Sequence, residues 1–389
     1  MAKIDWMKKV STLKGAVNEY RDIHESVIQT ASPSLNFIYG NGWGLPRGYS
    51  VMMYGPPKSG KSIITYLMAG GIHRDYPEGW VIKFNTEFRE QAQLPPSKMP
   101  MYGIDQKRWK AVEANNPEFV YNQITGEIDA WCKDGFPLVA VILDSMNGVQ
   151  GRRQMASEKG VMQQQIGDVA ATNKEGLKAV LEVQRRHNFA LIMTTHVGIE
   201  MDPIEQKRGN KFRMGAGIGC QHHGEYFMYV EANRNKAGRA DMTGTEFVNP
   251  NLKDMNDDAD RTAHKIRCVM KDATMGPKGR MGEFTFDYQQ GVINQHEEVY
   301  LLGYNRGAIL KDGGHYYTVP GIETPQCKGE ANFLNFLKTA PQVQEHILKE
   351  LKRQDLTGAS KKADAKAAAE WGSTIIPEDK DSPDVETEA

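Results

Sequence analysis

The fold of this chain is limited first by a motif of eight residues: Gly55, Pro56, Pro57, Lys58, Ser59, Gly60, Lys61 and Ser62. The motif satisfies the pattern G-x-x-x-x-G-K-[ST] at every fixed position. An apolar run of strand length, residues 49–54, precedes it, and residues 61–74 follow with the apolar spacing of a helix. Strand, glycine-rich loop and helix in this order predict a phosphate-binding loop inside an α/β fold.

The residue types in this loop suit a nucleoside triphosphate with Mg²⁺. Gly55 and Gly60 allow backbone turns that point N–H groups at phosphate oxygens, and the start of a helix adds partial positive charge. We expect Lys61 to bridge the β- and γ-phosphates of ATP, and Ser62 to hold Mg²⁺ through its hydroxyl.

Two further predicted strands end in carboxylates. Residues 80–85 form an apolar strand followed by Thr86 and Glu87, and a carboxylate there could polarise a water for attack on the γ-phosphate; the alternative is an exposed loop glutamate. Residues 138–144 form an unbroken apolar strand that ends in Asp144, the position expected to hold Mg²⁺ opposite Ser62. The alternating order of strands and helices predicts an NTPase core with a mainly parallel central sheet.

The composition is that of an ordinary soluble protein, with 40% hydrophobic and 25% charged residues among 389. No apolar run approaches the ~20 residues of a membrane span and no signal-peptide core is present, so we expect a cytoplasmic protein without a membrane partner. The four cysteines, which are far apart in sequence, predict neither a disulfide framework nor a zinc site: Cys132, Cys220, Cys268 and Cys327. Cys220, His222 and His223 could be pictured as metal ligands, but they lack a second ligand pair at zinc spacing.

The net charge of −1 is unevenly distributed along the chain. Residues 377–389 hold six acidic residues and one lysine, so the remainder has 47 basic and 43 acidic residues and a net charge of +4. A mildly basic body with an acidic tail is compatible with a nucleic-acid partner, although tails of this kind also serve solubility alone.

Two segments without regular periodicity carry basic residues. The first, residues 146–160, contains Arg152, Arg153 and Lys159. The second, residues 197–223, places an aromatic residue among four basic ones: Lys207, Arg208, Lys211, Phe212 and Arg213. Basic residues interleaved with an aromatic side chain suit a nucleic-acid strand, because the charges pair with phosphates and the ring lies beside bases.

The remaining pattern divides the chain into four parts. Residues 1–33 predict an N-terminal arm, residues 34–296 the ATPase core, residues 297–355 a small C-terminal domain, and residues 356–389 a disordered acidic tail. Within these parts we expect helices at 118–132, at a long stretch up to 187, and at 330–338 and 343–351, and further strands at 189–195, 226–230, 265–271 and 283–288.

With these features in place the sequence resembles the RecA family of ATP-dependent homologous recombinases over about residues 30–352. The resemblance includes residues 34–62, which approach and form the phosphate loop, the segments 85–87 and 143–145, the glycines at 215–219 and the stretch 298–303. It implies a RecA-like P-loop core, an N-terminal polymerisation arm and a small C-terminal α/β domain.

The resemblance also implies roles for individual residues. Glu87 falls at the catalytic glutamate, residues 151–162 at the first DNA-binding loop and residues 197–223 at the second. His196 falls where bacterial members have a glutamine that senses the γ-phosphate; phage strand-exchange proteins of the UvsX type also have histidine there, which makes the chain resemble a phage-encoded member.

Lys271 falls on the first of two family lysines that reach the ATP of a neighbouring subunit. The second position is Ala273, a departure, so either Lys278 or Arg280 substitutes or the contact in trans is weaker.

The function implied is a DNA-dependent ATPase that forms filaments on single-stranded DNA and catalyses homologous pairing and strand exchange in recombination and repair. ATP, Mg²⁺, single-stranded DNA, homologous duplex DNA and further copies of the chain are the expected ligands and partners, with single-strand-binding and mediator proteins as additional candidates. A hexameric helicase or motor on the same core is one alternative. A recombination mediator that binds nucleotide and DNA without hydrolysis is another, and the intact set of Lys61, Ser62, Glu87 and Asp144 argues against it.

Overall fold

The computed structural model describes residues 26–40, 42–86, 94–114, 117–146, 168–199, 212–214, 224–232, 263–312, 315–325 and 327–357. These residues form two units. Unit 1 contains residues 26–31, Ile38–Ala232 and Cys268–Arg280, within the described ranges. Unit 2 contains Ser32–Phe37 and residues 263–267 and 281–357. The domain boundaries predicted from the sequence stay a prediction.

Unit 1 is built on a sheet whose central strands are parallel. In spatial order its strands are β10 (Ala263–Ala273, which enters the unit at Cys268), β9 (Tyr226–Ala232), β3 (Ser50–Gly55), β7 (Ala190–Ile199), β6 (Leu138–Asp144), β4 (Trp80–Asn85) and β5 (Trp109–Glu113). From β9 to β5 each strand is parallel to its neighbours. The prediction of an α/β fold with a large, mainly parallel sheet is confirmed.

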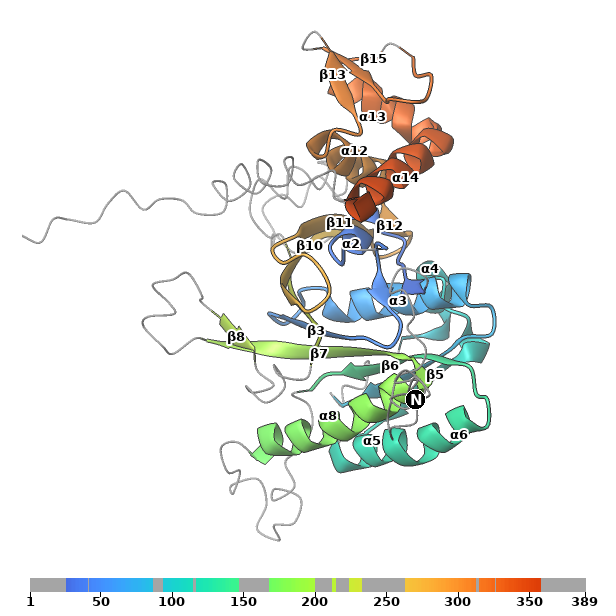
Figure 1. Ribbon diagram of the computed structural model, residues 1–389, viewed down its shortest axis with the longest axis vertical. Coiled ribbons are helices and arrows are strands. Elements are labelled where there is room, and N and C mark those ends of the chain that lie inside the picture. The colour runs from blue at the N-terminus through green and yellow to red at the C-terminus, as the bar shows by residue number, and fades with distance from the viewer. Residues whose placement is uncertain are drawn as a thin grey trace, which may run out of the picture. The chain divides into compact units, whose positions relative to one another are not determined.

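Helices cover both faces of this sheet (Figure 1). On one face lies α3 (Lys61–Asp75). On the other lie α5 (Pro117–Gln123), the π-helical turn η3 (Ile124–Ile128), α6 (Asp129–Lys133) and α8 (Asp168–His187). An apolar core fills the space under the second group, where Phe84 and Leu143 of the strands pack with Ile124 and Leu177 of the helices. Burial on both faces explains why the central strands are continuous apolar runs.

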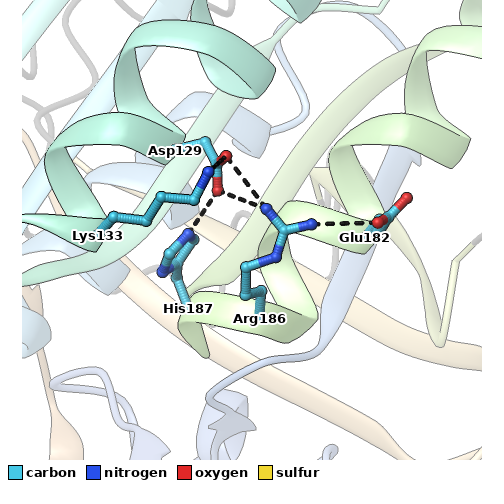
Figure 2. A network of polar contacts seen from close by, with 5 residues as sticks. All are labelled: Asp129, Lys133, Glu182, Arg186 and His187. Atoms are coloured by element: carbon cyan, nitrogen blue, oxygen red, sulfur yellow. Dashed lines mark hydrogen bonds and ion pairs between the residues drawn. The ribbon is translucent and has the colours of Figure 1, made fainter. Parts of the chain in front are cut away.

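A network of charged side chains fixes the end of α8 beside α6 (Figure 2). The Asp129 carboxylate accepts hydrogen bonds from Lys133 Nζ at 2.6 Å, Arg186 Nη1 at 2.9 Å and His187 Nε2 at 2.6 Å. Glu182 pairs with the same Arg186 guanidinium at 3.1 Å. Because α8 leads into β7, this network holds the helix end from which that central strand begins.

Short elements complete unit 1. They are β1 (Val27–Ile28), which pairs with β2 (Leu45–Pro46), and η1 (Pro96–Lys98), α4 (Met99–Tyr102) and η2 (Gln106–Arg108), which precede β5. Gly70 of α3 packs so closely on the backbone of α4 that an added Cβ would lie 1.6 Å from the carbonyl oxygen of Tyr102. A glycine is therefore required where these two helices cross.

In its described residues, unit 2 contains two groups of strands and four helices. The first part of β10 neighbours β11 (Met281–Asp287), which is antiparallel to β12 (Gly291–Ile293), while β13 (Leu310–Asp312), β14 (Tyr316–Thr318) and β15 (Cys327–Lys328) form an antiparallel sheet. The helices are α2 (Pro33–Phe37), α12 (Gln295–Asn305), α13 (Glu330–Thr339) and α14 (Pro341–Thr357). Phe333 at the centre contacts both Tyr300 and Tyr317 through ring packing. The sequence predicts α13 and α14 here, but it predicts neither α2 and α12 nor the strands β13 to β15, which are too short to show a periodicity.

Several predicted features lie outside the described residues: most of the N-terminal arm, Glu87, residues 147–167 with Arg152, Arg153 and Lys159, and the tail from residue 358. Within the described part, no helix is long and apolar enough to span a membrane. Cys132, Cys268 and Cys327 are free thiols.

Candidate functional site

The phosphate loop joins the carboxyl end of β3 to the start of α3, in the setting that the sequence predicts. Two residues of the loop take left-handed backbone conformations, Lys58 at φ 60° and Gly60 at φ 99°. At the other end of the loop, a Cβ on Gly55 would lie 1.9 Å from the carbonyl oxygen of Val230 in β9. Glycine is needed at both fixed positions, for space at Gly55 and for backbone conformation at Gly60.

The Lys61 ammonium lies inside the curve of the loop. It donates hydrogen bonds to the carbonyl oxygens of Gly55 and Pro56, each at 2.8 Å, and only 6% of the residue is exposed. Helix α3 begins at the same residue, and the N-terminus of a helix carries partial positive charge. A cation and a helix N-terminus that face the same loop form an anion-binding site.

Ser62 and Asp144 come together across the sheet edge. The Ser62 hydroxyl, at the start of α3, donates to Asp144 Oδ2, at the end of β6, at 3.0 Å. From β7, the Thr194 hydroxyl donates to Asp144 Oδ1 at 2.5 Å. A hydroxyl and a carboxylate at the mouth of a phosphate loop are hard oxygen ligands of the kind that Mg²⁺ accepts, so the residues present fit this ion. Among the described residues no group of three histidine, cysteine or acidic side chains could hold a metal ion.

Sequence reasoning missed the charged partner of Asp144, which is the lysine at the centre of β4. Lys83 Nζ lies 2.8 Å from Asp144 Oδ2 and donates to the Tyr66 hydroxyl at 3.0 Å. Lys83 is only 2% exposed. A signal was available, because a lysine within a strand buried on both faces needs an anionic partner.

The charges in this cluster hold one another in the ionised form. Burial raises the pKa of the Asp144 carboxyl, but the Lys83 charge and the hydrogen bonds from Lys83, Thr194 and Ser62 outweigh burial, and the pKa falls below its usual value. Burial likewise lowers the pKa of Lys83, and the attraction of Asp144 together with Tyr66 reverses the direction, so the pKa is raised. The cluster therefore holds an ammonium and a carboxylate as ions in the protein interior.

Glu87, predicted to position water, lies just outside the described residues, but the residue before it is firmly held. The backbone N–H of Thr86 donates to the carbonyl oxygen of Asp144 at 2.9 Å, and its hydroxyl donates to the carbonyl oxygen of Ser145. These two contacts anchor Thr86 at the end of β6, next to Asp144.

The structure places His196 beside the loop and Lys271 on a neighbouring strand. His196 is the register partner of Gly55 in the parallel pair β3 and β7. Lys271 is exposed on β10, with its ammonium 5.9 Å from the ring centroid of Tyr229, which packs edge to face on Tyr54. The roles expected for His196 and Lys271 stay predictions.

The second basic segment is not wholly irregular, which corrects the prediction for residues 197–223. β7 continues to Ile199, beyond the predicted end at residue 195, and pairs with β8 (Phe212–Met214) in an antiparallel ladder. In Figure 1 this pair extends past the rest of the sheet. The register places Arg213 opposite Gly198 and Phe212 opposite Ile199, while Lys207, Arg208 and Lys211 lie outside the described residues.

No family model matches this chain. Curated proteins named Protein RecA are similar to it over most of its length. The RecA of Streptomyces rimosus is 25% identical over 355 residues, which cover 88% of this chain and 82% of that protein. The RecA of Thermotoga neapolitana is 22% identical over 330 residues, 84% of each chain. The RecA of Psychrobacter arcticus is 23% identical over 368 residues, 95% of this chain and 92% of that protein. The chain therefore has distant RecA homologues over most of its length, and they support a recombinase of that family.

Proposed function

We propose that this chain is a DNA-dependent ATPase that assembles into filaments on single-stranded DNA and pairs that DNA with a homologous duplex. The observation that carries the proposal is the contact of 3.0 Å between Ser62 and Asp144 at the mouth of a complete phosphate loop. The distant similarity to RecA proteins over 84–95% of the chain supports the recombinase class rather than another NTPase on the same core.

In this proposal each residue of the site has a separate role. Lys61 and the first N–H groups of α3 bind the phosphates of ATP, while Ser62 and Asp144 hold Mg²⁺, which neutralises phosphate charge when bound. We assign the response to the γ-phosphate to His196, and the register of His196 with Gly55 supports this assignment. Glu87 orients the attacking water as general base.

We assign DNA and neighbouring subunits to other parts of the chain. We assign DNA contact to two basic sets, Arg152, Arg153 and Lys159 in the first segment and Lys207, Arg208, Lys211, Phe212 and Arg213 in the second. His196 lies on β7, and the residues of β7 that follow it pair with β8. A change at the nucleotide can therefore reach the second segment along a single strand. We assign Lys271 to the ATP of an adjacent copy and residues 1–33 to assembly, and histidine at position 196 favours a phage-encoded protein acting in the host cytoplasm.

The test uses Glu87→Gln, which keeps size and hydrogen bonding and removes the base. A recombinase holds its DNA-competent filament with bound ATP and uses hydrolysis to release it. We therefore expect hydrolysis to fall by on the order of 10²–10⁴ while filaments on single-stranded DNA last longer and still pair homologous strands. Electron microscopy, an ATPase assay and strand pairing are measured together; closed rings, or lost pairing with ATP and DNA binding intact, would refute the proposal.

A second experiment addresses the DNA segment. Neutralising Lys207, Arg208, Lys211 and Arg213 should flatten the slope of log affinity against log salt by up to ~0.7 for each lost phosphate contact on single strands. The matched control neutralises four exposed lysines elsewhere in unit 1, namely Lys107, Lys110, Lys174 and Lys178. Equal slopes for the two variants would remove the segment from the DNA site.

A further inference from the structure

The carboxylate proposed to hold the metal already has a cation of the protein beside it. Asp144 Oδ2 accepts a hydrogen bond from the Ser62 hydroxyl at 3.0 Å and lies 2.8 Å from the Lys83 ammonium. Asp144 Oδ2 therefore contacts both the expected metal ligand Ser62 and a fixed positive charge, the Lys83 ammonium. Lys83 is 2% exposed, so water screens that charge very little.

The same ammonium links the two elements that carry the metal ligands. Lys83 donates to the Tyr66 hydroxyl at 3.0 Å, and Tyr66 lies one turn beyond Ser62 on α3. Its other partner, Asp144, ends β6. Lys83 thus fixes the spacing between α3 and β6, and with it the approach of Ser62 to Asp144.

A simple role in stability does not account well for this arrangement. A buried ion pair is often replaceable by well-packed apolar residues without loss of stability, because desolvation offsets the attraction. Here the pair is placed where a divalent ion is expected, and an ammonium at that position repels the ion while it neutralises the carboxylate.

We propose that Lys83 is a positioning residue that sets the Ser62–Asp144 geometry and lowers the affinity of this pair for a divalent cation, so that metal binds together with nucleotide phosphates and not before them. The inference rests on the proposed nucleotide site. It assigns to Lys83 the coupling between metal binding and nucleotide binding. Lys83 neutralises the charge of Asp144, and the nucleotide phosphates supply the negative charge that the metal ion then needs.

The probe is Mn²⁺, titrated into the full-length protein without nucleotide and again with ADP, with free Mn²⁺ measured by electron paramagnetic resonance. Without nucleotide, Lys83→Met should bind Mn²⁺ at least about tenfold more tightly than the natural chain, as expected when a unit charge beside a divalent ion is removed. With ADP the gain should be smaller, because the phosphates then dominate the charge of the site. Lys83→Gln, which retains a hydrogen-bond donor, repeats the test in case Lys83→Met folds poorly.

Two controls separate this effect from a general change in charge. Lys110→Met removes an exposed lysine from the adjacent strand β5 and should leave Mn²⁺ affinity unchanged. Adding Asp144→Asn to Lys83→Met should abolish the gain. Unchanged or weaker Mn²⁺ binding by both Lys83 variants would overturn the inference. Failure of the natural chain to bind ADP would instead refute the proposed function, while the titration without nucleotide still decides the role of Lys83.

Discussion

Asp144 in unit 1 and Glu298 in unit 2 are both carboxylates in the protein interior, 8% and 4% exposed. Asp144 has hydroxyl donors and the Lys83 ammonium, and its pKa is lowered. Glu298 accepts hydrogen bonds from the Ser32 hydroxyl at 2.6 Å and the Ser34 N–H at 2.9 Å. Burial, only partly offset by these bonds, raises the pKa of Glu298 to about 8.

The difference between the two sites is the nature of the partners. Neutral donors satisfy Glu298 Oε2, and Glu298 Oε1 has no hydrogen-bond partner among the residues that the structure describes. A buried carboxylate keeps its charge where an opposite charge lies beside it, and it takes up a proton where it has only neutral donors. Unit 1 therefore maintains an ionised acid at the place where the proposed chemistry needs one.

Removal of the Lys83 ammonium should destabilise the folded protein, because Asp144 then lacks its opposite charge. Lys83→Met leaves an unpaired buried charge, and we expect the free energy of unfolding without metal to fall by about 3–5 kcal/mol in denaturant titrations. Adding Asp144→Asn should recover most of this loss, because no charge is then left unpaired. Lys110→Met serves as the control for loss of a lysine. A loss below about 1 kcal/mol would show that the two buried carboxylates do not differ in this way.

Glu298 should make the stability of unit 2 depend on pH. The ordinary pKa of a glutamate, 4.5, applies to the unfolded chain, and the pKa of Glu298 in the folded protein is about 8. Between these values the folded state retains a proton that the unfolded state has lost, so stability is greatest below the lower value and falls as pH rises, by up to about 1.4 kcal/mol per pH unit.

The measurement is denaturant unfolding across this pH range for the natural chain and for Glu298→Gln, which should flatten the dependence. Glu330→Gln, at an exposed position of the same unit, removes a similar acid as the control. A Glu298→Gln variant with the same pH slope as the natural chain would contradict the assignment.

The sequence was most informative where strands are buried on both faces. The bounds predicted for β4 and β6 agree with the structure, and β3 differs by one residue at each end. A parallel strand covered by helices is a continuous apolar run that ends abruptly, so its limits are visible in the sequence. The phosphate loop was also predictable, because phosphate binding requires fixed residue types at a fixed spacing within one short segment.

The partners of the buried charges were not predictable in the same way. Lys83 in its apolar strand signals a need for an anion, but its contacts with Tyr66 and Asp144 depend on how α3 and β6 pack. Glu298 meets Ser32 across 266 positions of sequence, and no local pattern announces that contact. The strand β5 was also missed, since residues Trp109–Glu113 alternate weakly in polarity at the sheet edge.

Asp129 offers an intermediate case, a carboxylate with several cations at the end of a helix. Burial raises its pKa, but the hydrogen bonds from Lys133 and His187 and the charge of Arg186 outweigh burial and lower the pKa to about 2. Its contribution to stability should therefore be present above the ordinary value of 3.8 and be lost as pH falls toward about 2.

We expect Asp129→Asn to lower the free energy of unfolding by about 1–3 kcal/mol at neutral pH, since several charge-assisted hydrogen bonds are weakened. The difference from the natural chain should shrink as the pH falls toward 2. Asp134→Asn, an exposed neighbour, is the matched control. If the loss caused by Asp129→Asn were the same at every pH, the network would act by packing and not by charge.

The smallest expected effects test whether the neutral hydroxyls around the Lys83–Asp144 pair matter less than the charges. Tyr66→Phe removes the hydroxyl that accepts from Lys83, and Thr194→Val removes the hydroxyl that donates to Asp144 with little change in shape. Each should lower the free energy of unfolding by about 1 kcal/mol, the usual net value of one hydrogen bond, because the opposite charge still satisfies the remaining partner. Denaturant titrations of both variants beside Lys83→Met provide the comparison. If Thr194→Val cost as much as Lys83→Met, the hydroxyl donors and not the ammonium would keep Asp144 ionised, and the contrast with Glu298 would have to be explained by the number of donors.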